Sequence, residues 1–166
     1  MVLIERLQTN VTVDALCQSF VGKGLSFFLD SSMHPGGLGD FSYLGADPYL
    51  IFQSKGDEVE INRCGVKTRL IANPLDVLQG LLAEHAIPVS DGLPFTGGAV
   101  GYFAYDSYPC VESIRQTAPE GLGLPDIYLG FYDAIVAIDH SDESVLAVAC
   151  GVNAEPEERL LGEQAL

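Results

Sequence analysis

The stretch Ile127–Ile138, IYLGFYDAIVAI, followed after a short gap by Val145–Cys150, VLAVAC, decides the fold of this chain. Both stretches are dominated by β-branched, aromatic and other apolar residues, which are typical of strands. The polar residues from His140 to Glu143 lie between them. Two apolar strands joined by a short polar turn predict an antiparallel hairpin.

Further apolar runs bounded by turn residues predict strands throughout the rest of the chain. Between residues 49 and 71, three such runs are separated by turns that contain Gly56 and Gly65. Glycine adopts the positive φ angles that tight turns need, so this segment predicts a meander. The expected strands are residues 25–29, 41–46, 49–53, 59–61, 66–71, 95–105, 127–138 and 145–150.

Three segments carry helix signals. Thr12 or Asp14 caps a short helix over 12–21, and Asn73 caps a second helix with Pro74 at its first position. Leu75, Leu78, Leu81 and Leu82 form the apolar stripe of the second helix.

A third helix is expected from Asn153 onward, with Pro156 near its first turn, and the sequence stops at Leu166 before an apolar face is complete. We therefore predict an α+β fold, a mostly antiparallel sheet of about eight strands with about three packed helices. The stretches 33–40 and 107–124 lack periodicity and are expected to be loops.

Composition restricts the class of function. The chain has 166 residues, 48% of them hydrophobic, and is expected to form a single domain over 1–166. Its 8 basic and 23 acidic residues give a net charge of −15, which would repel nucleic acid and anionic membranes. A mean hydropathy of +0.23 is high for a small chain with few charges, so we expect a further body to pack against it.

No sequence motif predicts a catalytic or metal-binding residue in these 166 residues. The cysteines are too widely spaced for a zinc site or a dense disulfide framework, and reduced thiols indicate a cytoplasmic protein. The histidines are expected to be exposed residues without a catalytic role. The cysteines are Cys17, Cys64, Cys110 and Cys150, and the histidines are His34, His85 and His140.

Two further patterns leave alternatives open. The glycines of 97–102 lack the spacing of a phosphate-binding loop, so we expect them to let a strand kink or another backbone approach closely. Lys67 and Arg69 alternate on one face of a strand and form the main basic concentration. They could hold an anion, contact a partner or form a solvated sheet edge.

The segment Leu29-Asp30-Ser31-Ser32 is the strongest candidate for a binding site. A carboxylate directly after an apolar strand must find hydrogen-bond donors if it is buried. An amino-acid ligand would supply them, with its ammonium on Asp30 and its carboxylate on the serine hydroxyls and backbone N–H groups. The alternative is that Asp30 and Ser31 only cap the turn.

Several segments, taken in order, resemble one family. They are Phe28-Leu29-Asp30-Ser31-Ser32, Phe41-Ser42-Tyr43-Leu44-Gly45-Ala46-Asp47-Pro48, Pro94 to Asp106 with its Gly-Gly-Ala-Val-Gly-Tyr run, Pro125-Asp126, and Tyr132-Asp133 through His140. The chain is similar over nearly its whole length to the N-terminal domain of component I of two synthases that use chorismate, anthranilate synthase and aminodeoxychorismate (para-aminobenzoate) synthase.

This resemblance implies a function that the residues alone do not. The whole enzyme would aminate chorismate with ammonia and Mg²⁺, and a glutamine amidotransferase, component II, would supply the ammonia. The chorismate and magnesium residues would belong to a C-terminal catalytic domain that lies outside this chain. The 166 residues would then be a non-catalytic domain that needs no cofactor of its own.

The resemblance also implies an amino-acid pocket, which binds tryptophan in the anthranilate synthases. The residues carried over to it are Leu29, Asp30, Ser31, Ser32, Phe41 and Ser42. Asp30 stands where the family's Leu-Leu-Glu-Ser element has Glu, and Asp40 stands where a basic residue is frequent. The shorter acid favours the para-aminobenzoate branch, with anthranilate synthase, or a separate small-molecule-binding module, as the alternatives.

Overall fold

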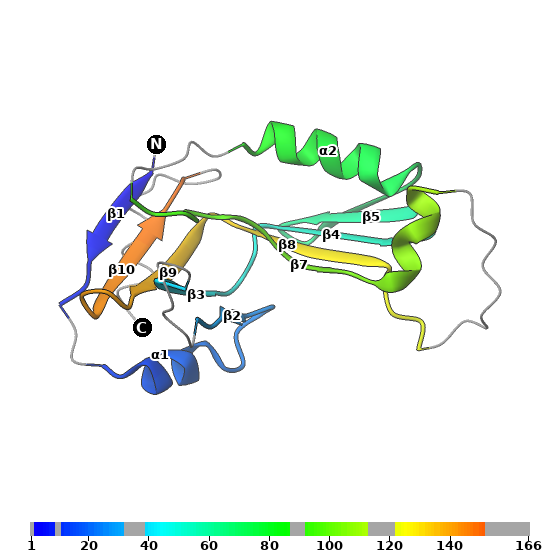
Figure 1. The fold of residues 1–166 in the computed structure, drawn as a ribbon. Coiled ribbons are helices and arrows are strands. Elements are labelled where there is room, and N and C mark those ends of the chain that lie inside the picture. Colours follow the sequence, from blue (N-terminus) through cyan, green and yellow to red (C-terminus); the bar gives the residue numbers. More distant parts are fainter. Residues whose placement is uncertain (1, 9–10, 32–38, 87–91, 113–121, 152–166) are drawn as a thin grey trace. The chain divides into compact units, whose positions relative to one another are not determined.

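The computed structural model describes residues 2–8, 11–31, 39–86, 92–112 and 122–151. The chain divides into two compact units (Figure 1). The first unit contains residues 1–48, 87–98 and 132–166, and the second contains residues 49–86 and 99–131. Each unit holds one five-stranded sheet.

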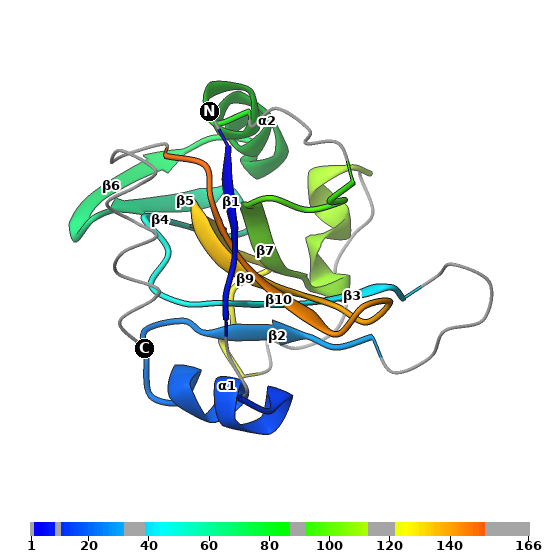
Figure 2. The same cartoon turned by 90° about the vertical axis from the view of Figure 1, so that its left-hand side faces the viewer.

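The sheet of the first unit has the strand order β1-β10-β9-β3-β2 (Figure 1), and Figure 2 shows the same strands from another side. All four neighbouring pairs are antiparallel. The turn of the β9–β10 hairpin lies at 140–143, as the sequence predicted. Its strands are β1 (Leu3–Arg6), β2 (Phe27–Leu29), β3 (Phe41–Gly45), β9 (Ala134–Asp139) and β10 (Ser144–Ala149).

Helix α1 (Val13–Phe20) covers one face of this sheet. The Thr12 hydroxyl accepts a hydrogen bond from the Ala15 N–H at 3.3 Å, which confirms the predicted cap. The helix contributes Phe20 to a core with side chains from β3, β9 and β10, namely Leu44, Val136, Ile138 and Val145. This packing fixes the strand ends on which the candidate site is built.

The sheet of the second unit has the order β6-β5-β4-β8-β7. The predicted meander is confirmed, and both turn glycines have positive φ, 55° at Gly56 and 90° at Gly65. The strands are β4 (Leu50–Lys55), β5 (Glu58–Arg63), β6 (Val66–Ile71), β7 (Gly98–Phe103) and β8 (Ile127–Tyr132).

Helix α2 (Pro74–Glu84) belongs to the second unit. The Asn73 side chain accepts from the Leu75 N–H at 2.9 Å, and Pro74 lies in the first turn, as predicted. Leu78 and Leu81 are buried, which confirms the centre of the apolar stripe. Leu82 is 47% exposed, so its assignment to the buried face was wrong.

The close-approach role predicted for the glycines is confirmed at Gly101 in β7. A Cβ atom there would meet the backbone of β8, at the Tyr128 carbonyl oxygen and at 2.9 Å from the Cα of Leu129. Only a residue without a side chain allows the two strands to lie this close.

The α+β class is confirmed, but three details differ from the sequence prediction. Residues 127–138 form two strands that separate at Asp133 and join different sheets. Residues 3–6 form a strand that was not predicted. With the division of 127–138, this raises the eight expected strands to ten among the described residues. The 3₁₀ helix η1 (Tyr105–Cys110) replaces part of the predicted loop. The helix expected from Asn153 and most of the loop at 33–40 lie outside the described residues.

Candidate functional site

A fully buried hydroxyl, that of Ser42 on β3, joins three other residues in the first unit. The Ser31 N–H donates to its Oγ at 3.0 Å. The same Oγ donates to Asp30 Oδ1 at 3.3 Å and lies 2.7 Å from Nε2 of His140. We call these four residues the Ser42 cluster.

Strand pairing explains why residues so distant in sequence meet here. Asp30 and Ser31 directly follow β2, which pairs with β3 through Leu29 and Tyr43. His140 directly follows β9, whose Ile138 is the β3 partner of Ser42. The His140 N–H also donates to the Asp40 carbonyl at 2.8 Å, which ties the end of β9 to the start of β3.

The Ser42 hydroxyl has one proton and two lone pairs, so its three contacts constrain one another. The Ser31 amide can only donate, and it occupies one lone pair. If Ser42 gives its proton to Asp30, the second lone pair must accept a proton from Nε2 of His140. The tautomer of His140 therefore decides whether the Asp30 carboxylate is bonded to Ser42.

One premise of the sequence prediction was wrong. Residues 25–29 were expected to form a buried strand, but β2 spans only 27–29 and is the last strand of its sheet. Phe28 is 40% exposed, Leu29 is 47% exposed, and Asp30 is exposed as well. Burial therefore does not force Asp30 to find donors, and solvent can reach its carboxylate.

The structure brings together three of the six predicted site residues: Asp30, Ser31 and Ser42. Leu29 and Phe41 lie on the opposite face of the sheet, because successive strand residues alternate between faces. Leu29 pairs with Tyr43, and the Phe41 ring stacks on the Tyr43 ring with centroids 6.2 Å apart. Ser32 lies outside the described residues.

His140 was expected to be an exposed residue of a hairpin turn, and this expectation was wrong. It is half-buried and contacts Ser42 directly. His85 was also wrongly expected to be exposed, since its side chain is 7% exposed and lies against the Tyr49 and Phe131 rings. His34 lies outside the described residues. The one feature of the sequence that could have indicated a role for His140 is its position directly after the first strand of the hairpin.

The Cys17 thiol lies within electrostatic range of Asp30, a member of the Ser42 cluster. Burial raises the pKa of the Cys17 thiol above its ordinary value, and the negative charges of Asp14 and Asp30 raise it further. The thiol is therefore protonated at neutral pH. All four cysteines are free thiols in this structure.

The described residues contain no group of three His, Cys, Asp or Glu side chains that could hold a metal ion. None of the helices within these ranges is long and apolar enough to span a membrane.

Known proteins with similar sequences are synthase components of two kinds, anthranilate synthase component 1 and aminodeoxychorismate synthase component 1. No protein-family model matches the chain. The resemblance predicted from the sequence motifs is therefore confirmed by homologues of both kinds.

Three relatives illustrate the match. Anthranilate synthase component 1 of Pseudomonas aeruginosa is 34% identical over 80% of this chain and 27% of its own length. Aminodeoxychorismate synthase component 1 of Salmonella typhimurium is 34% identical over 66% of this chain and 24% of its own length. Anthranilate synthase alpha subunit 2 of Arabidopsis thaliana is 34% identical over 73% of this chain and 22% of its own length. The chain thus spans about a quarter of the length of these relatives.

The crystal structure of anthranilate synthase component I from Streptococcus pneumoniae has a similar fold. The TM-score is 0.63 at 24% identity, and the match covers 81% of this chain and 31% of that one. This comparison supports the fold.

Proposed function

We propose that this chain is the non-catalytic, pocket-forming N-terminal domain of an aminodeoxychorismate synthase component I, whose whole enzyme aminates chorismate for para-aminobenzoate and folate synthesis. Homologues of this kind support the proposal, and the chain matches about a quarter of their length. The chemistry would then reside in a catalytic domain outside these 166 residues.

The nearest alternative is the same domain of an anthranilate synthase component I, in tryptophan synthesis. Relatives of both kinds reach 34% identity, so overall similarity does not separate them. Asp30, one carbon shorter than the Glu expected in a tryptophan-regulated site, favours the para-aminobenzoate branch. A stand-alone small-molecule-binding module is the third candidate, because the Ser42 cluster offers polar groups within one unit.

The proposal carries cofactor and partner expectations for the whole enzyme. It would use Mg²⁺ in its catalytic domain and ammonia from a glutamine amidotransferase, component II, in the cytoplasm. The relatives' names, "component 1" and "alpha subunit", fit an assembly with a second component.

The single observation that supports an amino-acid pocket in this domain is the Ser42 hydroxyl, which links Asp30 to Ser31. A ligand ammonium such as that of tryptophan would bind the exposed carboxylate of Asp30. The Ser31 N–H is already donated to Ser42, so the ligand carboxylate would take the Ser31 hydroxyl instead. The side chains of Leu29 and Phe41 lie on the opposite face of the sheet, so only their backbone groups would be able to contact the ligand.

An amination assay tests the catalytic part of the proposal. The 166-residue chain, mixed with chorismate, ammonia and Mg²⁺, should give no product, and any turnover would contradict its assignment as a non-catalytic domain. The whole protein encoded by the gene should place the amino group para to the carboxyl-bearing carbon. An ortho product would identify the anthranilate branch instead. A coding sequence without a catalytic part after Leu166 would favour the stand-alone module.

A further inference from the structure

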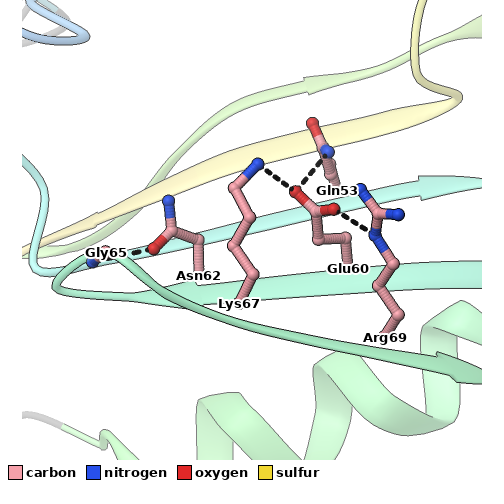
Figure 3. A network of polar contacts seen from close by, with 6 residues as sticks. All are labelled: Gln53, Glu60, Asn62, Gly65, Lys67 and Arg69. Carbon is pink, nitrogen blue, oxygen red and sulfur yellow. Dashed lines mark hydrogen bonds and ion pairs between the residues drawn. The ribbon is translucent and has the colours of Figure 1, made fainter.

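A second polar cluster lies on the sheet of the second unit, on the face turned away from α2 (Figure 3). Its centre is the Glu60 carboxylate on β5, whose side chain is only 11% exposed. Gln53 Nε2 and Lys67 Nζ donate to Oε1 at 3.0 and 2.9 Å, and Arg69 Nε donates to Oε2 at 2.6 Å. We call these four residues the Glu60 network.

The Glu60 network has more positive charge than its carboxylate needs. Two cations share one anion, so the group has a net charge of +1 within a chain of net charge −15. The hydrogen bonds from Lys67 and then Arg69 lower the pKa of the Glu60 carboxyl, so the carboxylate stays ionised at neutral pH. At neutral pH the network therefore combines one negative charge with the two positive charges of Lys67 and Arg69.

Arg69 presents that surplus charge to solvent. Its side chain is 78% exposed, and Nε is engaged with Glu60. Its two terminal nitrogens make no hydrogen bond to the described part of the chain. A guanidinium held at Nε keeps its outer edge in a fixed orientation, which suits a carboxylate that accepts two parallel hydrogen bonds.

A cavity of about 550 Å³ lies beside this edge, within the second unit. Arg69, Gln53 and Glu60 line it together with apolar residues, among them Ile71 and Pro125. Ile71 follows Arg69 by two residues on β6, so both side chains project from the same face. The Ile71 side chain is 68% exposed and would be buried by a ligand with an apolar body.

The other charges of the cavity limit what it can hold. The Lys55 ammonium is bonded to the buried Asp126 carboxylate at 2.8 Å, and Glu58 adds a negative charge to the lining. A polyanion would be repelled by Glu58 and by the acidic chain as a whole. We propose that this cavity binds a small organic monocarboxylate, with its carboxylate on the terminal nitrogens of Arg69 and its apolar body against Ile71.

Titration of the 166-residue chain with benzoate, followed by NMR at the Ile71 methyl groups, tests this site. Benzamide, which has the same shape without the charge, is the matched ligand. Benzoate should give saturable chemical-shift changes. Benzamide should bind at least about tenfold more weakly, because it cannot form the pair of charge-assisted hydrogen bonds. Equal binding of the two ligands, or shifts that are absent from Ile71, would overturn the proposal.

Substitutions of Arg69 test whether its guanidinium binds the benzoate carboxylate. Arg69→Gln should lower benzoate affinity about tenfold or more, whereas Arg6→Gln, which removes an exposed ion pair in the first unit, should leave it unchanged. Arg69→Gln should remain folded, because Lys67 and Gln53 still bind Glu60. Arg69→Lys keeps the positive charge but lacks the two parallel donors of the guanidinium, so it should give an intermediate affinity for benzoate. Wild-type affinity in both Arg69 variants would refute the assignment.

Discussion

The Ser42 cluster and the Glu60 network both gather three groups around one shielded oxygen-bearing side chain, but they do so with different chemistry. In the first unit the centre is a neutral hydroxyl with one proton, held by short side chains and a backbone amide. In the second unit it is a carboxylate held by three long, partly exposed donors. The comparison shows that a hydroxyl centre couples its neighbours through a proton, whereas a carboxylate centre couples them through charge.

The largest effect is expected from Ser42→Ala. This change leaves the Ser31 N–H without its acceptor and His140 without its hydroxyl partner, in a part-buried setting. The free energy of unfolding should fall by about 1–3 kcal/mol, the cost of removing a hydrogen-bond partner from part-buried polar groups. Urea denaturation of the variant and of wild type measures the difference.

Ser19→Ala is the matched control for this prediction. Among the described residues, the Ser19 hydroxyl donates a hydrogen bond only to the Leu16 carbonyl of its own helix, at 2.6 Å. Its removal should change stability by less than about 0.5 kcal/mol. Equal effects of the two serine variants would mean that the Ser42 hydroxyl is not the shared centre of a cluster.

Glu60→Gln tests the charge-based centre through the pH dependence of stability. The carboxyl pKa is lowered in the folded chain, so its stabilising effect is complete above the ordinary value of 4.5 and is lost as the pH falls through the folded value. Wild type should lose stability in that acid window, and Glu60→Gln should lose less. The denaturation midpoint, measured from neutral to acid pH, gives both slopes.

Glu58→Gln provides the control for the acid slope, because Glu58 is an exposed residue of the same strand and takes no part in the Glu60 network. This variant should follow the wild-type curve. If Glu60→Gln followed the wild-type curve as well, the ion pairs of Glu60 would not contribute to stability.

The smallest effect is expected in the rate of cysteine alkylation. This rate probes Cys17, which neighbours the Ser42 cluster but is not part of it. The raised pKa of Cys17 leaves little thiolate at neutral pH, so iodoacetamide should modify Cys17 more slowly than the exposed Cys64. Asp14→Asn removes one of the charges that raise the pKa and should speed the reaction at Cys17 alone. Peptide mass spectrometry over a time course measures the rates, and a faster reaction at Cys17 than at Cys64 would contradict the account.

Most of the fold could be predicted from local patterns. The caps at Thr12 and Asn73, the turns at Gly56 and Gly65 and the hairpin at 140–143 all depend on residues close in sequence. The separation of residues 127–138 at Asp133 could not be predicted, because an unbroken apolar run does not show that its two halves join different sheets.

The candidate site was predicted only in part, for a related reason. Asp30, Ser31 and Ser42 were identified from motifs, but the exposure of β2 depends on its place at the sheet edge. His140 meets Ser42 because β9 pairs with β3, across 98 positions in the sequence. Pairing between distant strands leaves no local signal at either residue.

Tryptophan titration most directly tests the claim that Asp30 forms an amino-acid site in this domain. The chain contains no tryptophan, so added tryptophan is the only indole fluorophore. We predict weak, saturable emission changes that disappear in Asp30→Ala and persist in Asp76→Ala, a change at an exposed acid of α2 in the second unit. Binding that is tight and unaltered by Asp30→Ala would contradict the account.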